Sequence, residues 1–189
     1  MERFLLVSSA QKGGELLIQL LRERNPHQIV TAASGGEARR ALAEQTFSLL
    51  LINAPLSDEF GHDLALTAAR TTSAGVLLLV KHEHADEVSA RGESAGVLVV
   101  PKPVNRVLLY QAIRLAEAAR NRLLGLQQEK ETLESKIQEI RLVDRAKCAL
   151  IQYLSMTEPQ AHRYIEKEAM DRRVTRREVA EGILQTYEA

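Results

Sequence analysis

The 189-residue chain is long enough for one or two modest domains, and a hydrophobic content of 45% is sufficient to bury a core. The 25 basic and 25 acidic residues cancel and only 4% of residues are aromatic, which argues against whole-chain attraction to nucleic acid or membranes and against stacking platforms for single strands. A single cysteine excludes an internal disulfide, and no signal-peptide pattern or membrane-length apolar run occurs, so we expect a cytoplasmic protein.

Residues 1–104 alternate short apolar runs with amphipathic segments. The apolar runs are FLLVSS, QIVTAA, LLLIN, VLLLV and VLVVPKP. Helical segments near residues 15–24, 37–44, 63–70 and 85–93 separate them, and glycines such as Gly13-Gly14 fall at the expected joints. This alternation predicts an α/β fold, a doubly wound parallel five-stranded sheet with helices on both faces.

Residues 105–140 form a different pattern, one long helix whose apolar positions are spaced alternately three and four residues apart. Spacing of this kind over four heptads is typical of a coiled coil, and we expect a parallel homodimer. We expect the first part, residues 109–116, to pack on the chain's own sheet instead. The rest of the helix is too long to stay in contact with so small a sheet. Lys130 interrupts the seam, where a charge costs stability but fixes register. The predicted dimerisation residues are Leu123, Leu126, Lys130, Leu133, Ile137 and Ile140.

Residues 141–189 form a charge-rich tail with three expected helices, near 143–153, 158–170 and 175–187. Thr157 is followed three residues later by Gln160, and Thr175 is followed three residues later by Glu178. This is the spacing of a capping box at a helix start. The small residues of the tail allow its helices to pack closely. We expect a small three-helix bundle, with a core that includes Ala146, Ala161, Ala169, Met170 and Ala180.

Several features of residues 1–104 coincide with a known pattern. Asn53 ends the third apolar run, Pro55 follows it, Gly61 lies eight residues beyond Asn53, and Lys102-Pro103 closes the last run. Together they resemble a response-regulator receiver domain, which implies the flavodoxin-like strand order 2-1-3-4-5. Receivers hold magnesium with an acidic pair, accept phosphate on an aspartate, and add a Thr or Ser and a lysine. The corresponding positions here are Ser8, Ser9, Asn53, Val80 and Lys102.

Only the lysine of that set is retained. Acyl-phosphate formation needs a carboxylate nucleophile and a divalent cation, and an amide, serine hydroxyls and a valine supply neither. We therefore predict a pseudo-receiver in which Asn53 caps loop amides or is simply a polar strand end. Asp58, Glu59 and Asp63 are expected to face solvent. A phosphorylation-controlled switch that uses Asp58 or Asp63 remains the alternative.

The tail carries a second resemblance. Its carriers are Arg145-Ala146-Lys147, Leu150-Ile151, Thr157-Glu158 with Ala161, Ala169 to Arg173, and Glu178 to Glu181 with Ile183-Leu184. At this spacing they resemble the ANTAR domain, an RNA-binding antitermination module found after some receivers. The resemblance implies that paired tails hold hairpins of a leader transcript, so that a competing terminator stem does not form.

Basic residues are concentrated in the same tail, where guanidinium groups suit phosphates and unpaired bases. The predicted RNA-binding residues are Lys147, Arg163, Lys167, Arg172, Arg173, Arg176 and Arg177, with Lys147, Arg172 and Arg173 as first choices. By composition alone, a solvated face in which acidic neighbours pair the arginines would be favoured, and the family resemblance reverses that preference. A DNA-binding regulator is the other alternative.

Other chemistry is weakly indicated. His82-Glu83-His84 is expected in a loop without further metal ligands, and Cys148 is expected as a small buried residue on a helix. We therefore expect that the protein is not an enzyme and that it binds no metal or cofactor. The sequence predicts a dimeric RNA-binding antitermination regulator, which resembles the amidase-operon type of antiterminator and is controlled by a partner protein rather than by phosphate.

Overall fold

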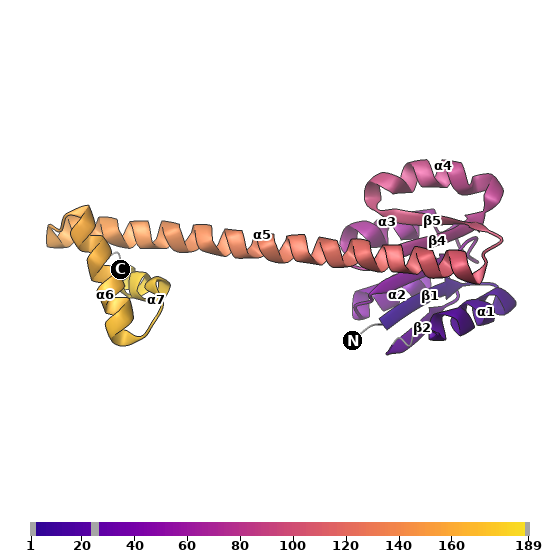
Figure 1. The fold of residues 1–189 in the computed structure, drawn as a ribbon, viewed down its shortest axis with the longest axis horizontal. Coiled ribbons are helices and arrows are strands. Elements are labelled where there is room, and N and C mark those ends of the chain that lie inside the picture. The colour runs from indigo at the N-terminus through magenta and orange to yellow at the C-terminus, as the bar shows by residue number, and fades with distance from the viewer. Residues whose placement is uncertain (1–2, 24–26, 188–189) are drawn as a thin grey trace. The chain divides into compact units, whose positions relative to one another are not determined.

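The computed structural model describes residues 3–23 and 27–187, and the chain divides at Gly125 into two compact units, residues 1–125 and 126–189. Each unit has its own apolar core. Figure 1 shows the elements of both units in chain order.

The first unit is built on a five-stranded sheet in which every neighbouring pair of strands is parallel. The strands are β1 (Arg3–Ser8), β2 (Gln28–Ala32), β3 (Leu49–Asn53), β4 (Gly75–Lys81) and β5 (Val97–Lys102). Their order is β2-β1-β3-β4-β5, which confirms the predicted flavodoxin-like sheet. All five residues of β3 are buried, as expected of a central strand that is covered on both faces.

Helices cover both faces of this sheet (Figure 1). One face packs on α1 (Gln11–Arg22) and on the beginning of α5 (Arg106–Leu154). The other face packs on α2 (Gly35–Glu44), α3 (His62–Thr71) and α4 (His82–Gly92), and a short 3-10 turn, η1 (Glu93–Ala95), follows α4. The predicted doubly wound arrangement is therefore correct.

Helices α1, α2 and α4 begin earlier than predicted. Helix α1 already includes Gly13-Gly14, which are therefore not at a joint, and α4 includes His82-Glu83-His84, which are not in a loop. A Cβ atom at Gly13 would lie 3.2 Å from Asn53 Nδ2. The first turn of α1 thus needs small residues because it passes close to the end of β3.

Helix α5 is continuous over 49 residues. Leu109, Ile113 and Ala116 are buried against the sheet, which confirms that this part of the helix packs on its own unit. The helix does not break near residue 141, so the separate helix predicted over residues 143–153 is the end of α5. The reason is local, since no proline or glycine interrupts the chain between residues 126 and 154.

In the second unit the end of α5 packs with α6 (Glu158–Arg172) and α7 (Arg176–Tyr187), so three helical segments share one core as predicted. Both predicted capping boxes form, at the starts of α6 and α7. The Thr157 amide donates to Gln160 Oε1 at 2.8 Å, and the Thr175 amide donates to Glu178 Oε2 at 2.7 Å. Ala146, Ala161, Ala169 and Ala180 are buried, but Met170 is 72% exposed, so its predicted place in the core is wrong.

Candidate nucleic-acid interface

The turn between α6 and α7 gathers arginines at one corner of the second unit. Helix α6 ends in a Schellman arrangement, in which the Val174 amide donates to the Ala169 carbonyl and the Arg173 amide to the Met170 carbonyl. Arg173 takes the left-handed conformation with φ of 55°, a position where glycine is usual. This helix end therefore places the Arg173 side chain on the turn between α6 and α7, at a small backbone cost.

The four arginines of this corner are all exposed. The side chain of Arg177 pairs with Glu181 at 2.9 Å, and that of Arg176 lies 3.6 Å from Glu139. Within the part of the chain that the structure describes, no ion pair is seen for Arg172 or Arg173. Arg176 and Arg177 also stand in the first turn of α7, where the helix dipole disfavours cations, so the corner favours an external anion.

The other predicted contact residues lie in two different settings. Arg163 and Lys167 are exposed on α6, one turn apart. Lys147 is only 17% exposed, and its ammonium group lies 2.9 Å from Asp144 and 3.0 Å from Glu158. Those two carboxylates raise the pKa of Lys147. Lys147 therefore ties α5 to α6, and it would reach RNA only by leaving both partners.

A cleft of about 370 Å³ lies beside the arginine corner, and the sequence did not predict it. Tyr164, Glu168 and Arg172 of α6 form one wall, and Gly182 and Tyr187 of α7 belong to the other. The available signal was the spacing of Tyr164, Glu168 and Arg172, since residues four apart lie on the same side of a helix. This spacing was overlooked because only 4% of the residues in the chain are aromatic, which argued against stacking sites.

The predicted coiled-coil seam lies open along α5. Leu133 is 60% exposed and Ile140 is 61% exposed, and Leu123, Leu126 and Ile137 are also exposed. Lys130 lies 3.6 Å from Glu134, one turn along the same helix. Large apolar side chains in this number on one helix favour a partner helix.

At the carboxyl edge of the sheet, the polar side chains at the phosphoacceptor positions of a receiver are bonded to each other or to nearby loop carbonyls. Asn53 is 8% exposed, and its Nδ2 donates to Ser8 Oγ at 2.9 Å rather than capping loop amides. Ser9 donates to the Pro55 carbonyl, Lys102 donates to the Ala54 carbonyl, and Val80 is fully buried. Burial, with help from nearby Lys81, lowers the pKa of Lys102.

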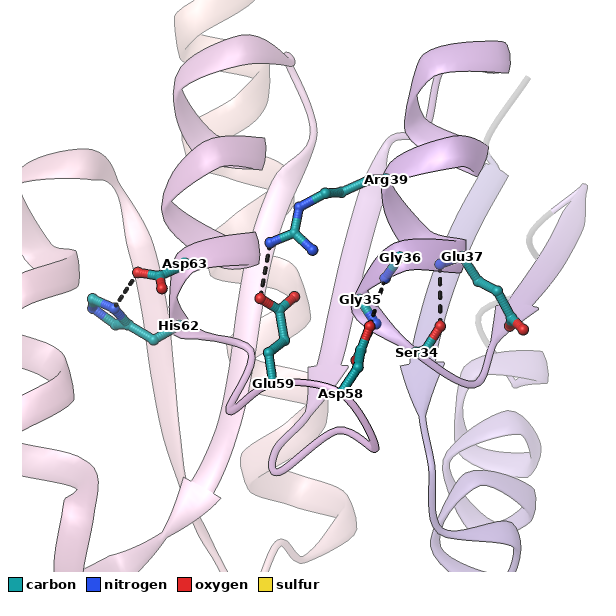
Figure 2. A network of polar contacts seen from close by, with 9 residues as sticks. All are labelled: Ser34, Gly35, Gly36, Glu37, Arg39, Asp58, Glu59, His62 and Asp63. Atoms are coloured by element: carbon teal, nitrogen blue, oxygen red, sulfur yellow. Dashed lines mark hydrogen bonds and ion pairs between the residues drawn. The ribbon is translucent and has the colours of Figure 1, made fainter.

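The carboxylates of the β3–α3 loop are held by α2, as Figure 2 shows. Asp58 accepts from the amides of Gly35 at 2.8 Å and Gly36 at 2.9 Å, and these bonds lower the pKa of Asp58. Glu59 pairs with Arg39 at 2.9 Å. Asp58 is exposed as predicted, whereas the Glu59 side chain is only 22% exposed. The prediction missed that both are bonded to α2, whose first turn offers free amide donors to Asp58. Asp63 is exposed and lies 3.6 Å from the ring of His62.

The remaining candidates for chemistry are accounted for by local contacts. The His84 ring meets the Phe60 ring edge-on at 5.8 Å, and no cluster of three potential metal ligands occurs among residues 3–23 and 27–187. Cys148 is exposed, contrary to the prediction. None of the helices that the structure describes combines the length and apolar character needed to cross a membrane.

Comparisons with known proteins agree with both units. The ANTAR domain family matches residues 131–184. The chain is 32% identical over 171 residues to the transcriptional regulatory protein PdtaR of Mycobacterium tuberculosis, covering 90% of this chain and 83% of the relative. It is also 32% identical over 124 residues to the aliphatic amidase regulator of Pseudomonas aeruginosa, covering 64% of this chain and 61% of that protein.

Solved structures resemble the first unit. A signal receiver domain of an HD domain-containing protein from Pseudomonas fluorescens has a TM-score of 0.58 at 23% identity, over 66% of this chain and 92% of that one. A response regulator receiver domain protein from Clostridium thermocellum has a TM-score of 0.57 at 20% identity, over 65% of this chain and 99% of that one. These matches support the receiver-like fold.

Proposed function

Because the chain belongs to the family of ANTAR-domain response regulators, we propose that it is a dimeric RNA-binding antitermination regulator whose second unit binds hairpins of a leader transcript. The observation that carries the proposal is the corner between α6 and α7. There Arg172 and Arg173 are exposed without an ion pair in the part of the chain described, and Arg173 is held in an unusual backbone conformation.

Hairpin RNA suits this corner better than duplex DNA. The arginines sit on a short turn and at two helix ends, so their donors approach a ligand from different directions rather than from one straight face. Guanidinium groups at a turn fit the bent backbone and the unpaired bases of a loop. Arg163 and Lys167 add two exposed cations on α6 that suit the phosphates of the adjoining stem.

The dimer is supported by the open seam of α5. Leu126, Leu133, Ile137 and Ile140 recur at heptad positions and are all exposed in the single chain. Burying them against a second copy removes apolar surface from water, at about 25 cal/mol per Å². Lys130 at a core position favours a defined register over a tighter but less specific pairing.

Control by a partner protein rather than by phosphate is supported by the edge of the sheet. The amide of Asn53 is engaged with Ser8, and both carboxylate oxygens of Asp58 accept backbone amides. Asn53 has no carboxylate, and both carboxylate oxygens of Asp58 are already hydrogen-bonded. A partner that covers the arginine corner or the seam of α5 would silence the regulator without any covalent change.

A competition experiment tests the proposal. Hairpins selected by the full-length protein from a pool with one stem and a randomised loop are labelled, and unlabelled hairpin RNA or duplex DNA is added at one fixed salt concentration. Hairpin RNA is expected to displace the label at far lower concentration than DNA. Equal or better displacement by duplex DNA would favour a DNA-binding regulator, and failure of any hairpin to bind would refute the proposal.

A further inference from the structure

The cleft beside the arginine corner has walls that suit a flat ring. Tyr164, on α6, is 38% exposed and lines one wall. Tyr187, on α7, lines the other, and its ring stacks on that of Tyr153 at 5.3 Å with an angle of 19° between the ring planes. Tyr187 is therefore held in place, while Tyr164 presents its ring at the surface. A volume of about 370 Å³ lies in the range of small-molecule clefts.

The polar groups of the cleft define what kind of ring it accepts. Glu168 and Arg172 follow Tyr164 at intervals of one helical turn and line the same cleft. Within the described residues, Glu168 has no ion pair, so its two carboxylate oxygens remain as acceptors. Arg172 supplies donors at the mouth, on the side of the positive corner. A ring with adjacent N–H donors and an attached phosphate complements both groups.

Gly182 lines the α7 wall of the cleft. It lies inside α7, where glycine is less favourable than alanine, and a Cβ added there would meet nothing within 4 Å. Packing therefore does not require glycine at this position. Because Gly182 lines the cleft, a side chain at this position would narrow it.

We infer that this cleft receives one unpaired guanine of the RNA loop, stacked on Tyr164 and read by Glu168, while Arg172 contacts the adjoining phosphate. Guanine is the nucleobase that presents two adjacent N–H donors on its Watson–Crick edge, N1–H and the 2-amino group, which match the two oxygens of a carboxylate. The inference rests on the proposed function and adds the base that the interface selects.

The test compares guanine with inosine, which lacks the 2-amino group. A guanine is expected at one fixed loop position in hairpins selected by the wild-type protein. Its replacement by inosine should weaken wild-type binding about tenfold or more, the value of a hydrogen bond to a charged group. Glu168→Gln should bind the guanine hairpin more weakly and should lose little further affinity with inosine. Hairpins without a selected guanine, or an equal inosine effect on both proteins, would overturn the inference.

Two further pairs of variants separate the cleft from the general RNA surface. Tyr164→Ala should lose about tenfold in affinity, whereas Tyr164→Phe keeps the stacking face and binds normally. Gly182→Ala should raise the thermal midpoint yet weaken binding, and Gly125→Ala, another helical glycine with open space around it, should raise the midpoint without changing affinity. Normal binding by Gly182→Ala or Tyr164→Ala would contradict the inference even if hairpins bind, and absence of all hairpin binding would instead refute the proposed function.

Discussion

Asn53 is the residue that most directly separates this chain from a phosphorylated receiver. Its amide donates to the Ser8 hydroxyl, so the polar side chains at the ends of β1 and β3 are bonded to each other. Restoring a carboxylate alone would not restore the chemistry. The metal site would still consist of serine hydroxyls, and the buried carboxylate could receive a hydrogen bond from Ser8 only if that hydroxyl gave up its bond to the Ala10 carbonyl.

Asn53→Asp should therefore lose stability without gaining a phosphoryl group. We expect a decrease of about 2 kcal/mol in the free energy of unfolding, because a nearly buried carboxylate is desolvated and Ser8 must leave the Ala10 carbonyl to donate to it. Urea unfolding measures the loss, and intact mass after incubation with acetyl phosphate and magnesium measures modification. Asn105→Asp is the matched control, since the Asn105 side chain is exposed and already acts as an acceptor for the Leu108 amide. Phosphorylation of Asn53→Asp or of the wild type would count against the account.

Asp58 gives the first unit an acid-sensitive contact. Because the amides of Gly35 and Gly36 lower the pKa of Asp58 below its ordinary value of 3.8, the folded state binds fewer protons than the unfolded state. The contribution to stability is thus complete above pH 3.8 and is lost as pH falls through the folded-state pKa. Asp58→Asn should lower the thermal midpoint at neutral pH, and its difference from wild type should shrink as the solution is acidified below pH 3.8. A difference that does not change with pH would contradict this role.

At the scale of elements, the central question is what covers the seam of α5. Ile137→Glu places a charge in the predicted seam but removes nothing from the core of either unit, since Ile137 is exposed in the single chain. We expect the full-length protein to sediment as a dimer and the variant as a monomer with unchanged helix content. Ser135→Glu adds the same charge away from the seam and should stay dimeric. A monomeric wild type would refute the dimer.

The elements also show how far the sequence can be interpreted. The strands were predictable because doubly covered strands are continuous apolar runs, and the capping boxes marked the starts of α6 and α7. The early start of α1 was not, because it depends on the close approach of Gly13 to the end of β3. Helix α4 follows β4 directly, without the loop that was predicted between them. Met170 was assigned to the core beside Ala169, although adjacent helical residues point about 100° apart and only one can face the same core.

Among the site residues, the arginine corner was predictable because its members are close in sequence. The cleft with Tyr164 and Gly182 was not, since its walls come from two helices and meet only after folding. The holding of Asp58 by α2 was missed for the same reason. The two hydrogen bonds join Asp58 to glycines that lie 23 and 22 positions earlier in the sequence, and no common motif links them.

At the scale of the whole molecule, dimerisation predicts avidity. Two second units in one dimer make the binding of a second hairpin intramolecular, which can raise affinity by about 10² or more without a new contact. Wild type should therefore bind an RNA with two tandem hairpins much more tightly than one with a single hairpin. Monomeric Ile137→Glu should bind the single hairpin normally and lose the tandem advantage. Equal affinity of wild type for both RNAs would argue against bivalent binding.

The most direct test is the affinity of the double variant Arg172→Glu/Arg173→Glu for a hairpin that wild type binds. If the corner between α6 and α7 grips RNA, the variant should bind at least about 100-fold more weakly, with a shallower dependence of affinity on salt. Arg40→Glu/Arg70→Glu, which makes the same change in charge at exposed positions of the first unit, should bind like wild type. Unchanged affinity and salt dependence in the first variant would contradict the account.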